Sequence, residues 1–120
     1  RLRSAQMAIA RKRMLHEVPN ADVVVTNPTH YAVALRYDAE NMTAPQVVAK
    51  GADFLARKIR EIATEAGVPV VEKPELARTL YAAVEPGQTI PETLFVAVAE
   101  ILAMVYRLRK KRMTPRGNVK

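Results

Sequence analysis

Asn27-Pro28-Thr29-His30 is the segment of this sequence whose residue types could support a reaction. The backbone nitrogen of the next residue usually attacks an Asn side chain, but Pro28 has no N–H and cannot act in that way. The reverse attack stays open. The Asn27 side-chain amide nitrogen can add to the Asn27 main-chain carbonyl, close a succinimide ring and expel the Pro28 nitrogen. This segment therefore permits the chain to cut itself between Asn27 and Pro28.

An amide nitrogen is a weak nucleophile, so such a cut depends on the surrounding chain. A rigid turn must align the amide with the carbonyl, and donors must stabilise the oxyanion and protonate the leaving nitrogen. His30 is the nearest titratable group that could move this proton, and Thr29 could hydrogen-bond within the turn. The alternative is an ordinary Asn-Pro turn in which Thr29 caps the next strand and His30 is structural.

Two β-strands are expected to hold this turn. The β-branched run Ala21-Asp22-Val23-Val24-Val25-Thr26 is typical of a strand that is buried on both faces. From Tyr31 to Tyr37, large apolar residues alternate with Ala and Arg, which predicts a second strand with one better-buried face. Residues 38–42 are polar and predict a connection.

Helical patterns flank this pair of strands. Leu2, Ala5 and Ile9 form a thin apolar stripe in a basic N-terminal helix. Thr43-Ala44-Pro45-Gln46 has the pattern of a capping box with Pro in the first turn, so we expect it to open a long helix. The apolar stripe of that helix would consist of Val48, Ala52, Leu55, Ile59, Ile62 and Ala66.

The remaining elements alternate in type. Residues 68–71 predict a short strand. Because a strand interior disfavours Pro, either this strand lies near the edge of the sheet or Pro69 stands at its start. Residues 75–84 predict a short helix. Thr89-Ile90-Pro91-Glu92 is a second capping box that would open the last helix. The stripe of that helix would be Leu94, Val98, Ile101, Leu102 and Val105. We therefore expect an α/β fold, with a small central β-sheet packed by about four helices, and with an N-terminal linker helix.

The charge is distributed unevenly along the chain. The net charge of +7 is the sum of five cations in residues 1–13, a net −5 in residues 14–106 and seven cations in residues 107–120. An acidic body with basic ends disfavours a compact nucleic-acid-binding domain, although the basic ends keep such a module open as an alternative. The tails also hold none of the aromatic residues that could stack on bases.

Composition narrows the possible chemistry further. The absence of Cys excludes disulfides and thiolate chemistry, and His16 and His30 alone cannot form a metal site, so no cofactor or metal is expected. The sequence has no glycine-rich phosphate loop or Ser/His/Asp set, which leaves a turnover enzyme with His30 as general base as a weak hypothesis. The longest apolar stretch, residues 94–106, is too short to span a bilayer. The start at Arg1 suggests an excised part of a longer protein.

Residues 21–35, centred on Asn27-Pro28-Thr29-His30, closely resemble the FlhB/YscU/SpaS family of flagellar and type III secretion export-switch proteins, and its flagellar branch most closely. The resemblance extends from about residue 1 to residue 113. It includes Ala44-Pro45, Val48-Ala49-Lys50-Gly51, Leu76-Ala77-Arg78, Leu80-Tyr81, Ile90-Pro91 and Ala97-Val98-Ala99-Glu100.

The resemblance implies the cytoplasmic domain of a protein of the bacterial inner membrane, anchored by an N-terminal transmembrane region outside this sequence. It implies one self-cleavage at Asn27-Pro28, assisted by Thr29 and His30, after which both pieces stay together. The implied role is to switch export from rod and hook subunits to filament subunits. The implied partners are a hook-length control protein, FlhA-type and other export-apparatus proteins, and export substrates, with no nucleic acid. A virulence type III secretion switch protein is the alternative.

The sequence also suggests a division of the chain and two minor interpretations. Residues 1–20 would be a membrane-proximal basic linker helix, residues 21–113 the export-switch domain, and residues 114–120 a flexible basic tail. Lys50-Gly51 could serve partner docking, or Gly51 could simply allow close packing. Tyr81 and Tyr106 are expected to pack against the core or between helices.

Overall fold

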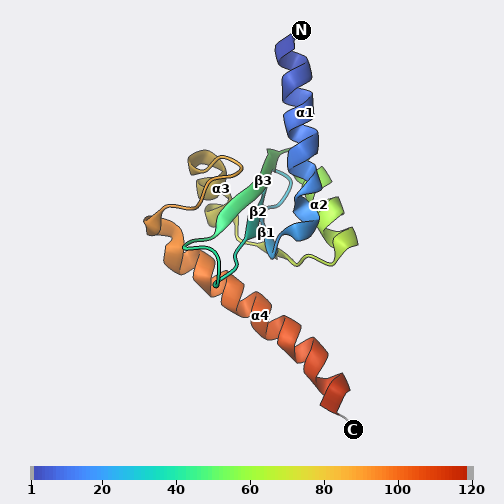
Figure 1. The fold of residues 1–120 in the computed structure, drawn as a ribbon, viewed down its shortest axis with the longest axis vertical. Helices are drawn as coiled ribbons and strands as arrows, with labels where there is room; N and C mark the ends of the chain where they lie inside the picture. Colours follow the sequence, from blue (N-terminus) through green and yellow to red (C-terminus); the bar gives the residue numbers. More distant parts are fainter. Residues whose placement is uncertain (1, 119–120) are drawn as a thin grey trace.

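One mixed four-stranded sheet organises the fold, in the order β3-β2-β1-β4. Figure 1 labels β1, β2 and β3 at the centre of the molecule. This computed structural model describes residues 2–118, with side chains described for residues 3–110. The strands are β1 (Val23–Asn27), β2 (Tyr31–Arg36), β3 (Gln46–Ala52) and β4 (Val70–Glu72). The helices are α1 (Leu2–His16), α2 (Phe54–Ala66), α3 (Pro74–Ala83) and α4 (Phe95–Asn118), with short 3₁₀ turns η1 (Val18–Asn20) and η2 (Glu92–Leu94). The predicted α/β class is confirmed.

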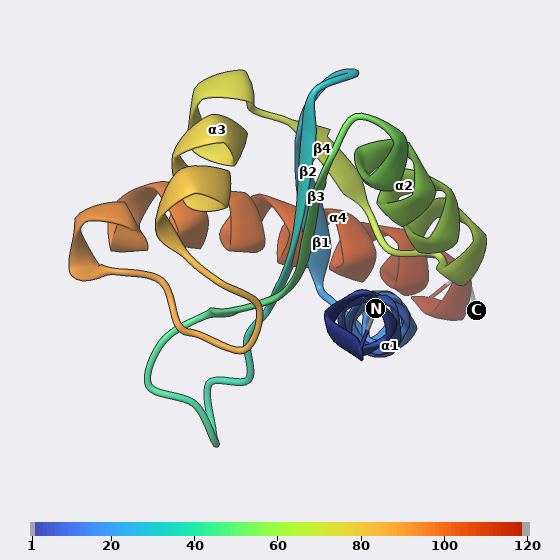
Figure 2. The same cartoon turned by 90° about the horizontal axis from the view of Figure 1, so that it is seen from above.

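Helices cover both faces of the sheet, which Figure 2 shows edge on. On one face, α3 and the first half of α4 pack against β1, β2 and β3. On the other face, α2, η1 and the end of α1 cover the same three strands. Because both faces are covered, the strands must carry apolar side chains in both directions.

β1 is an interior strand that contributes to both cores. It pairs antiparallel with β2 and parallel with β4. Val23 and Val25 point to the α3 side and Val24 to the α2 side, and none of the three is exposed to solvent. The prediction of a strand buried on both faces is therefore confirmed, and the residues before Asn27 are held by backbone pairing on two edges.

β2 differs from the sequence prediction in one respect. Its large residues Val33 and Leu35 enter the α3-side core as expected, but Ala32 and Ala34 are equally buried on the α2 side. The predicted contrast between a better-buried and a worse-buried face is therefore wrong. The small alanine side chains let α2 approach the sheet closely, so the weakly apolar face is covered too.

The first capping box does not open a helix. Residues 46–52 form β3, which pairs antiparallel with β2, and α2 begins only at Phe54. Local capping chemistry was overridden because Val47, Val48 and Ala49 gain a buried strand position beside β2. The expected stripe is confirmed only from Leu55 to Ile62, since Ile59 is fully buried on α2 and Leu55 and Ile62 are partly buried beside it. Ala66, the last predicted position, is exposed.

Gly51 lies on β3 where this strand passes closest to α2. A Cβ atom at Gly51 would lie 2.6 Å from Leu55 Cγ and 2.8 Å from Leu55 Cβ. No side chain fits there without displacement of α2, so the packing interpretation of Gly51 is the one the structure supports.

The other sequence-predicted elements are present. The short strand after Pro69 is β4, at one edge of the sheet, and the helix expected at residues 75–84 is α3. The last helix begins through η2 and continues as α4, with Val98, Ile101, Leu102 and Val105 buried. Thr89 does not cap it, because η2 has Pro91 at its N-cap without a side-chain hydrogen bond and Thr89 instead bridges to Gln46 on β3.

The two long helices project from this body in Figure 1. On α1, Met7 and Ile9 are 55% exposed, and only Met14 and Leu15 pack against the core. α4 continues to Asn118, so no helix end marks the predicted start of a tail at residue 114. The division into linker, switch domain and tail therefore stays a prediction. Within the described part of the chain, none of the helices combines the length and apolar character needed to cross a membrane.

Candidate functional site

Asn27, Pro28, Thr29 and His30 form a tight turn between β1 and β2. The His30 N–H donates to the Asn27 carbonyl oxygen at 2.9 Å, and Thr29 has a φ of +67°. This bond, Pro at the second position and a positive φ at the third are features of a type II turn, which normally has Gly or Asn where Thr29 stands. A β-branched residue there costs on the order of 1–3 kcal/mol. The turn is therefore strained one residue beyond the Asn27–Pro28 bond.

The main-chain carbonyl of Asn27 is already engaged by a donor. The His30 N–H points at its oxygen, the atom that would carry negative charge if the Asn27 side chain attacked the carbonyl carbon. The Asn27 side chain is partly buried, and its amide has no hydrogen-bond partner among the residues with described side chains. The amide nitrogen is thus not held in another interaction that attack would have to break.

The His30 ring lies beside the turn rather than in the core. Its Nδ1 atom is 3.1 Å from the Thr29 hydroxyl and 3.2 Å from the Pro28 carbonyl oxygen. A protonated Nδ1 donates to the Pro28 carbonyl, and an unprotonated Nδ1 accepts from the Thr29 hydroxyl. Thr29 and His30 are exposed, so the imidazole can exchange protons with water. The structure brings together all four residues singled out in the sequence.

Two contacts tie the turn to the rest of the fold. The Asp53 N–H donates to the His30 carbonyl oxygen at 2.9 Å. The Tyr31 ring, first in β2, stacks on the Tyr81 ring of α3 with centroids 4.5 Å apart. Sequence analysis missed both contacts, because each joins residues more than twenty positions apart in the chain.

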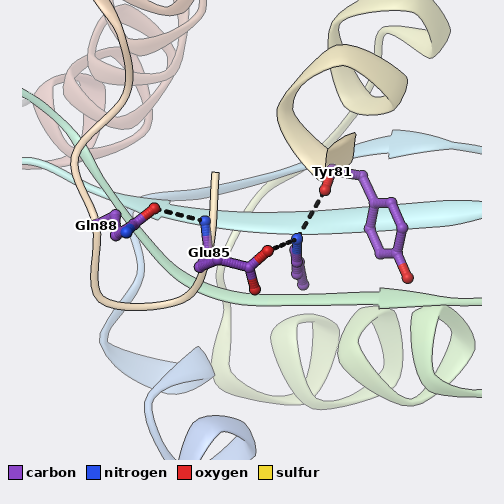
Figure 3. A network of polar contacts seen from close by, with 4 residues as sticks. Tyr81, Glu85 and Gln88 are labelled. Atoms are coloured by element: carbon purple, nitrogen blue, oxygen red, sulfur yellow. Dashed lines mark hydrogen bonds and ion pairs between the residues drawn. The ribbon is translucent and has the colours of Figure 1, made fainter. Parts of the chain in front are cut away.

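Lys50 lies at the centre of a polar network between β3 and the end of α3. Figure 3 shows this network and labels Tyr81, Glu85 and Gln88. The Lys50 Nζ donates to the Tyr81 carbonyl at 2.7 Å, pairs with Glu85 Oε2 at 3.2 Å and lies 4.8 Å from the centre of the Tyr81 ring. The Gln88 side-chain oxygen accepts from the Glu85 N–H at 3.1 Å. The Lys50 side chain is only 14% exposed, so it ties β3 to α3 instead of standing free for a partner. The expectation that Tyr81 packs within the fold is confirmed.

An apolar groove of about 320 Å³ opens beside α4. Its walls come from the end of β2, the β2–β3 connection and one face of α4. They are Tyr37, Thr43, Pro45, Phe95, Ala99, Leu102, Ala103 and Tyr106. Phe95 is 38% and Tyr106 41% exposed, so aromatic surface is available to a partner. Partial burial and then the negative charge of Asp22 raise the pKa of Tyr106, which keeps its phenol neutral at physiological pH.

The connection that forms one wall of this groove is stabilised by Asp38. The Asn41 side-chain amide donates to one Asp38 carboxylate oxygen at 2.7 Å and the Glu40 N–H donates to the other at 3.1 Å. These hydrogen bonds, first that of Asn41, lower the pKa of Asp38. Asp38 therefore remains ionised and holds this connection in a defined turn.

The described part of the chain holds no group of three or more His, Asp or Glu side chains that could bind a metal ion.

A family model and several curated proteins match this chain. The model, described as "FlhB HrpN YscU SpaS Family", matches residues 1–105. The flagellar biosynthetic protein FlhB of Escherichia coli K12 is 56% identical over 113 residues, which cover 94% of this chain and 30% of that protein. FlhB of Bacillus subtilis 168 is 54% identical over 111 residues, covering 92% of this chain and 31% of that protein. The chain thus spans about a third of the length of these relatives.

Solved structures share the fold. The cytoplasmic domain of FlhB from Shewanella putrefaciens has a TM-score of 0.81 and 51% identity, covering 85% of this chain and 78% of that one. A mutated EscU C-terminal domain has a TM-score of 0.74 and 33% identity, covering 77% and 92%. The PscU C-terminal domain has a TM-score of 0.62 and 40% identity, covering 65% and 99%.

Proposed function

Since this chain belongs to the FlhB HrpN YscU SpaS family, we propose that it is the cytoplasmic export-switch domain of a flagellar type III export apparatus and that it cuts itself once at the Asn27–Pro28 bond. The observation that carries the cleavage proposal is the strained turn, in which the Asn27 carbonyl already accepts a hydrogen bond and the Asn27 amide has no hydrogen-bond partner among the described side chains. The flagellar assignment is favoured over a virulence system by identities of 54–56% to FlhB proteins, against 33% and 40% to EscU and PscU.

The proposed reaction needs only groups in the turn and water. The Asn27 side-chain nitrogen bonds to the Asn27 carbonyl carbon while the His30 N–H holds the oxygen that becomes negative. The bond to the Pro28 nitrogen then breaks, and the proton lost by the amide reaches that nitrogen through water or the His30 ring. The products are a succinimide at residue 27, which water can open, and a new N-terminal proline. Strain at Thr29 is relieved by the cut, which lowers the barrier relative to a relaxed turn.

His30→Ala is expected to slow cleavage by roughly 10- to 100-fold without abolishing it. The substitution removes an imidazole that can relay a proton but keeps the main-chain N–H that holds the Asn27 carbonyl. The rate is followed as the fraction of cut chain on denaturing gels after refolding. His16→Ala, at the exposed end of α1, is the matched control and should leave the rate unchanged. An equal rate in His30→Ala would remove the imidazole from the mechanism.

We assign the whole protein's role by the same reasoning. The cut domain would switch export from rod and hook subunits to filament subunits and act with a hook-length control protein and FlhA-type components. The exposed basic helix α1, with Arg3, Arg11, Lys12 and Arg13 on its surface, would lie near the inner membrane on the cytoplasmic side, where cations favour anionic lipid. Cleavage happens once per chain, so the domain is not a turnover enzyme.

The apolar groove beside α4 suits the docking of an export substrate. An unfolded substrate segment can place an apolar side chain against Phe95, Ala99 and Tyr106, and the exposed aromatic surface supports such contact. This docking is part of the proposed function and is independent of cleavage.

Ala103→Glu is expected to reduce export of rod and hook subunits at least tenfold while self-cleavage continues at the parent rate. Ala103 is an exposed residue on the groove wall. A carboxylate there would weaken the contact between the groove and an apolar substrate side chain, and it would not enter the core. Export is measured as hook subunit in the culture supernatant of cells that carry the variant in the full-length protein. Ala82→Glu, on the exposed face of α3, is the control. Normal export by Ala103→Glu would exclude the groove as the docking site.

A further inference from the structure

Two non-glycine residues in the described part of the chain have a positive φ, and one hydrogen bond connects their neighbourhoods. Thr29 has a φ of +67° in the turn, and Asp53, between β3 and α2, has a φ of +52° with a ψ of −114°. The latter pair of angles is that of the first central residue of a type II′ turn, a position that favours Gly. The Asp53 N–H donates to the carbonyl of His30, which follows Thr29 directly.

Hydrogen bonds on both sides of His30 fix the peptide groups around it. Its N–H donates to the Asn27 carbonyl and its carbonyl accepts from the Asp53 N–H, each at 2.9 Å. The φ of Thr29 itself is set by the peptide group between Pro28 and Thr29, which neither bond engages. What the two bonds fix is His30, whose N–H they hold on the Asn27 carbonyl oxygen.

Asp53 itself is anchored by its backbone rather than by its carboxylate. The Asp53 side chain is exposed and makes no capping hydrogen bond to α2. The Asp53 carbonyl accepts from the Arg57 N–H at 3.0 Å, which is the first turn of α2, and the preceding Ala52 pairs with Tyr31 across β2 and β3. Because α2 is buried through Ala56 and Ile59, the donor N–H is fixed relative to the core.

We propose that Asp53 is a positioning residue for the cleavage, whose main-chain N–H clamps the carbonyl of His30 and so holds the Asn27–Pro28 bond in the reactive turn. The inference rests on the proposed self-cleavage. It means that the connection between β3 and α2 at Asp53, and not only the four residues of the turn, sets the cleavage rate. The clamp keeps the His30 N–H on the carbonyl oxygen of the bond to be cut.

The test replaces single backbone groups. An α-hydroxy acid at residue 53 exchanges its N–H for an ester oxygen, and the same exchange at Asn41, whose N–H donates to Asp38 at 3.1 Å in an exposed connection, is the matched control. Each chain is prepared unfolded, refolded by dilution and followed by denaturing gel. We expect the ester at residue 53 to slow cleavage roughly 3- to 10-fold, from the net worth of one hydrogen bond, and the control to stay within about twofold.

Ordinary substitutions provide a second pair of variants. Asp53→Gly keeps the N–H and suits the positive φ, so cleavage should remain within about twofold of the parent rate. Asp53→Val, a β-branched residue that resists a positive φ, should displace the connection between β3 and α2 and slow cleavage like the ester. Circular dichroism and urea unfolding of each chain, in the Asn27→Ala background, confirm that it folds.

A double substitution separates positioning from general loss of structure. If the clamp acts through the His30 N–H, the ester at residue 53 should slow a chain that already carries an ester at residue 30 by less than about twofold, because that chain has no N–H there to hold in place. A folded ester chain that cleaves at the parent rate would overturn the inference, as would equal slowing in the parent and the residue-30 ester backgrounds. Absence of cleavage in the parent chain itself would overturn the proposed function and the inference with it.

Discussion

Asn27→Ala is expected to remain a single chain under denaturing conditions, whereas the parent protein separates into pieces of 27 and 93 residues. The substitution removes the attacking nitrogen but leaves the β1–β2 pairing, the Pro28 turn position and the His30 N–H in place. Because no other group in the turn can form the cyclic product, the loss of cleavage should be complete rather than partial.

The mass spectrum of the folded protein, recorded after denaturation, decides this prediction. Asn20→Ala is the control, since Asn20 is an exposed residue that precedes Ala21 rather than a proline. Under native conditions the two pieces of the parent should elute together. A parent chain that stays intact after prolonged incubation in the folded state would refute self-cleavage and leave the fold unaffected.

Leu35→Ala should cause the largest loss of stability among the sheet substitutions considered, about 2–5 kcal/mol. Leu35 is fully buried on β2, directly opposite Val23 of β1, in the core covered by α3 and α4. The cavity left behind would weaken the contact that holds the first piece of a cut chain. The free energy of unfolding is measured by urea titration in the Asn27→Ala background, where the chain is continuous.

In the cut protein the same substitution should release the piece of 27 residues at a lower urea concentration, and the midpoint should fall on dilution. Val70→Ala on the exposed edge strand β4, with Val70 39% exposed, is the control and should cost about 0.5 kcal/mol or less. A loss below about 1 kcal/mol for Leu35→Ala would mean that the core around β1 rearranges to fill the space.

Much of the fold followed from local patterns that agreed with the tertiary structure. The β-branched run before Asn27 became an interior strand, and the stripe from Val98 to Val105 became the buried face of α4. The family resemblance of residues 21–35 is confirmed by the family match and by the FlhB structures. The predicted secondary structure was wrong where a capping pattern competed with sheet pairing, as at Thr43-Ala44-Pro45-Gln46. A capping pattern reports only neighbouring residues, whereas the pairing with β2 depends on residues farther away in the chain.

The site was accessible to sequence reasoning only in part. The residues of the proposed cleavage are consecutive, so the possible reaction could be predicted from Asn27 and Pro28 alone. Their surroundings could not be predicted, because the Asp53 N–H and the Tyr81 ring contact the turn and its flank from distant positions in the chain and no sequence pattern indicates a backbone hydrogen bond of this kind. The positive φ of Thr29 was also not predicted, because Thr at this position does not indicate a positive φ.

The interior position of β1 has a mechanical consequence. α1 leads directly through η1 into β1, which is bonded to β2 along one edge and to β4 along the other. Once the Asn27–Pro28 bond is cut, any tension transmitted along α1 can reach the remainder of the domain only through the non-covalent contacts of the end of α1, of η1 and of β1. A pull along β1 would load the bonds of both ladders at once, in shear, instead of opening them one after another. The cut domain would thus resist a pull up to a definite force, set by one buried strand and by the packing of Val18 and the end of α1.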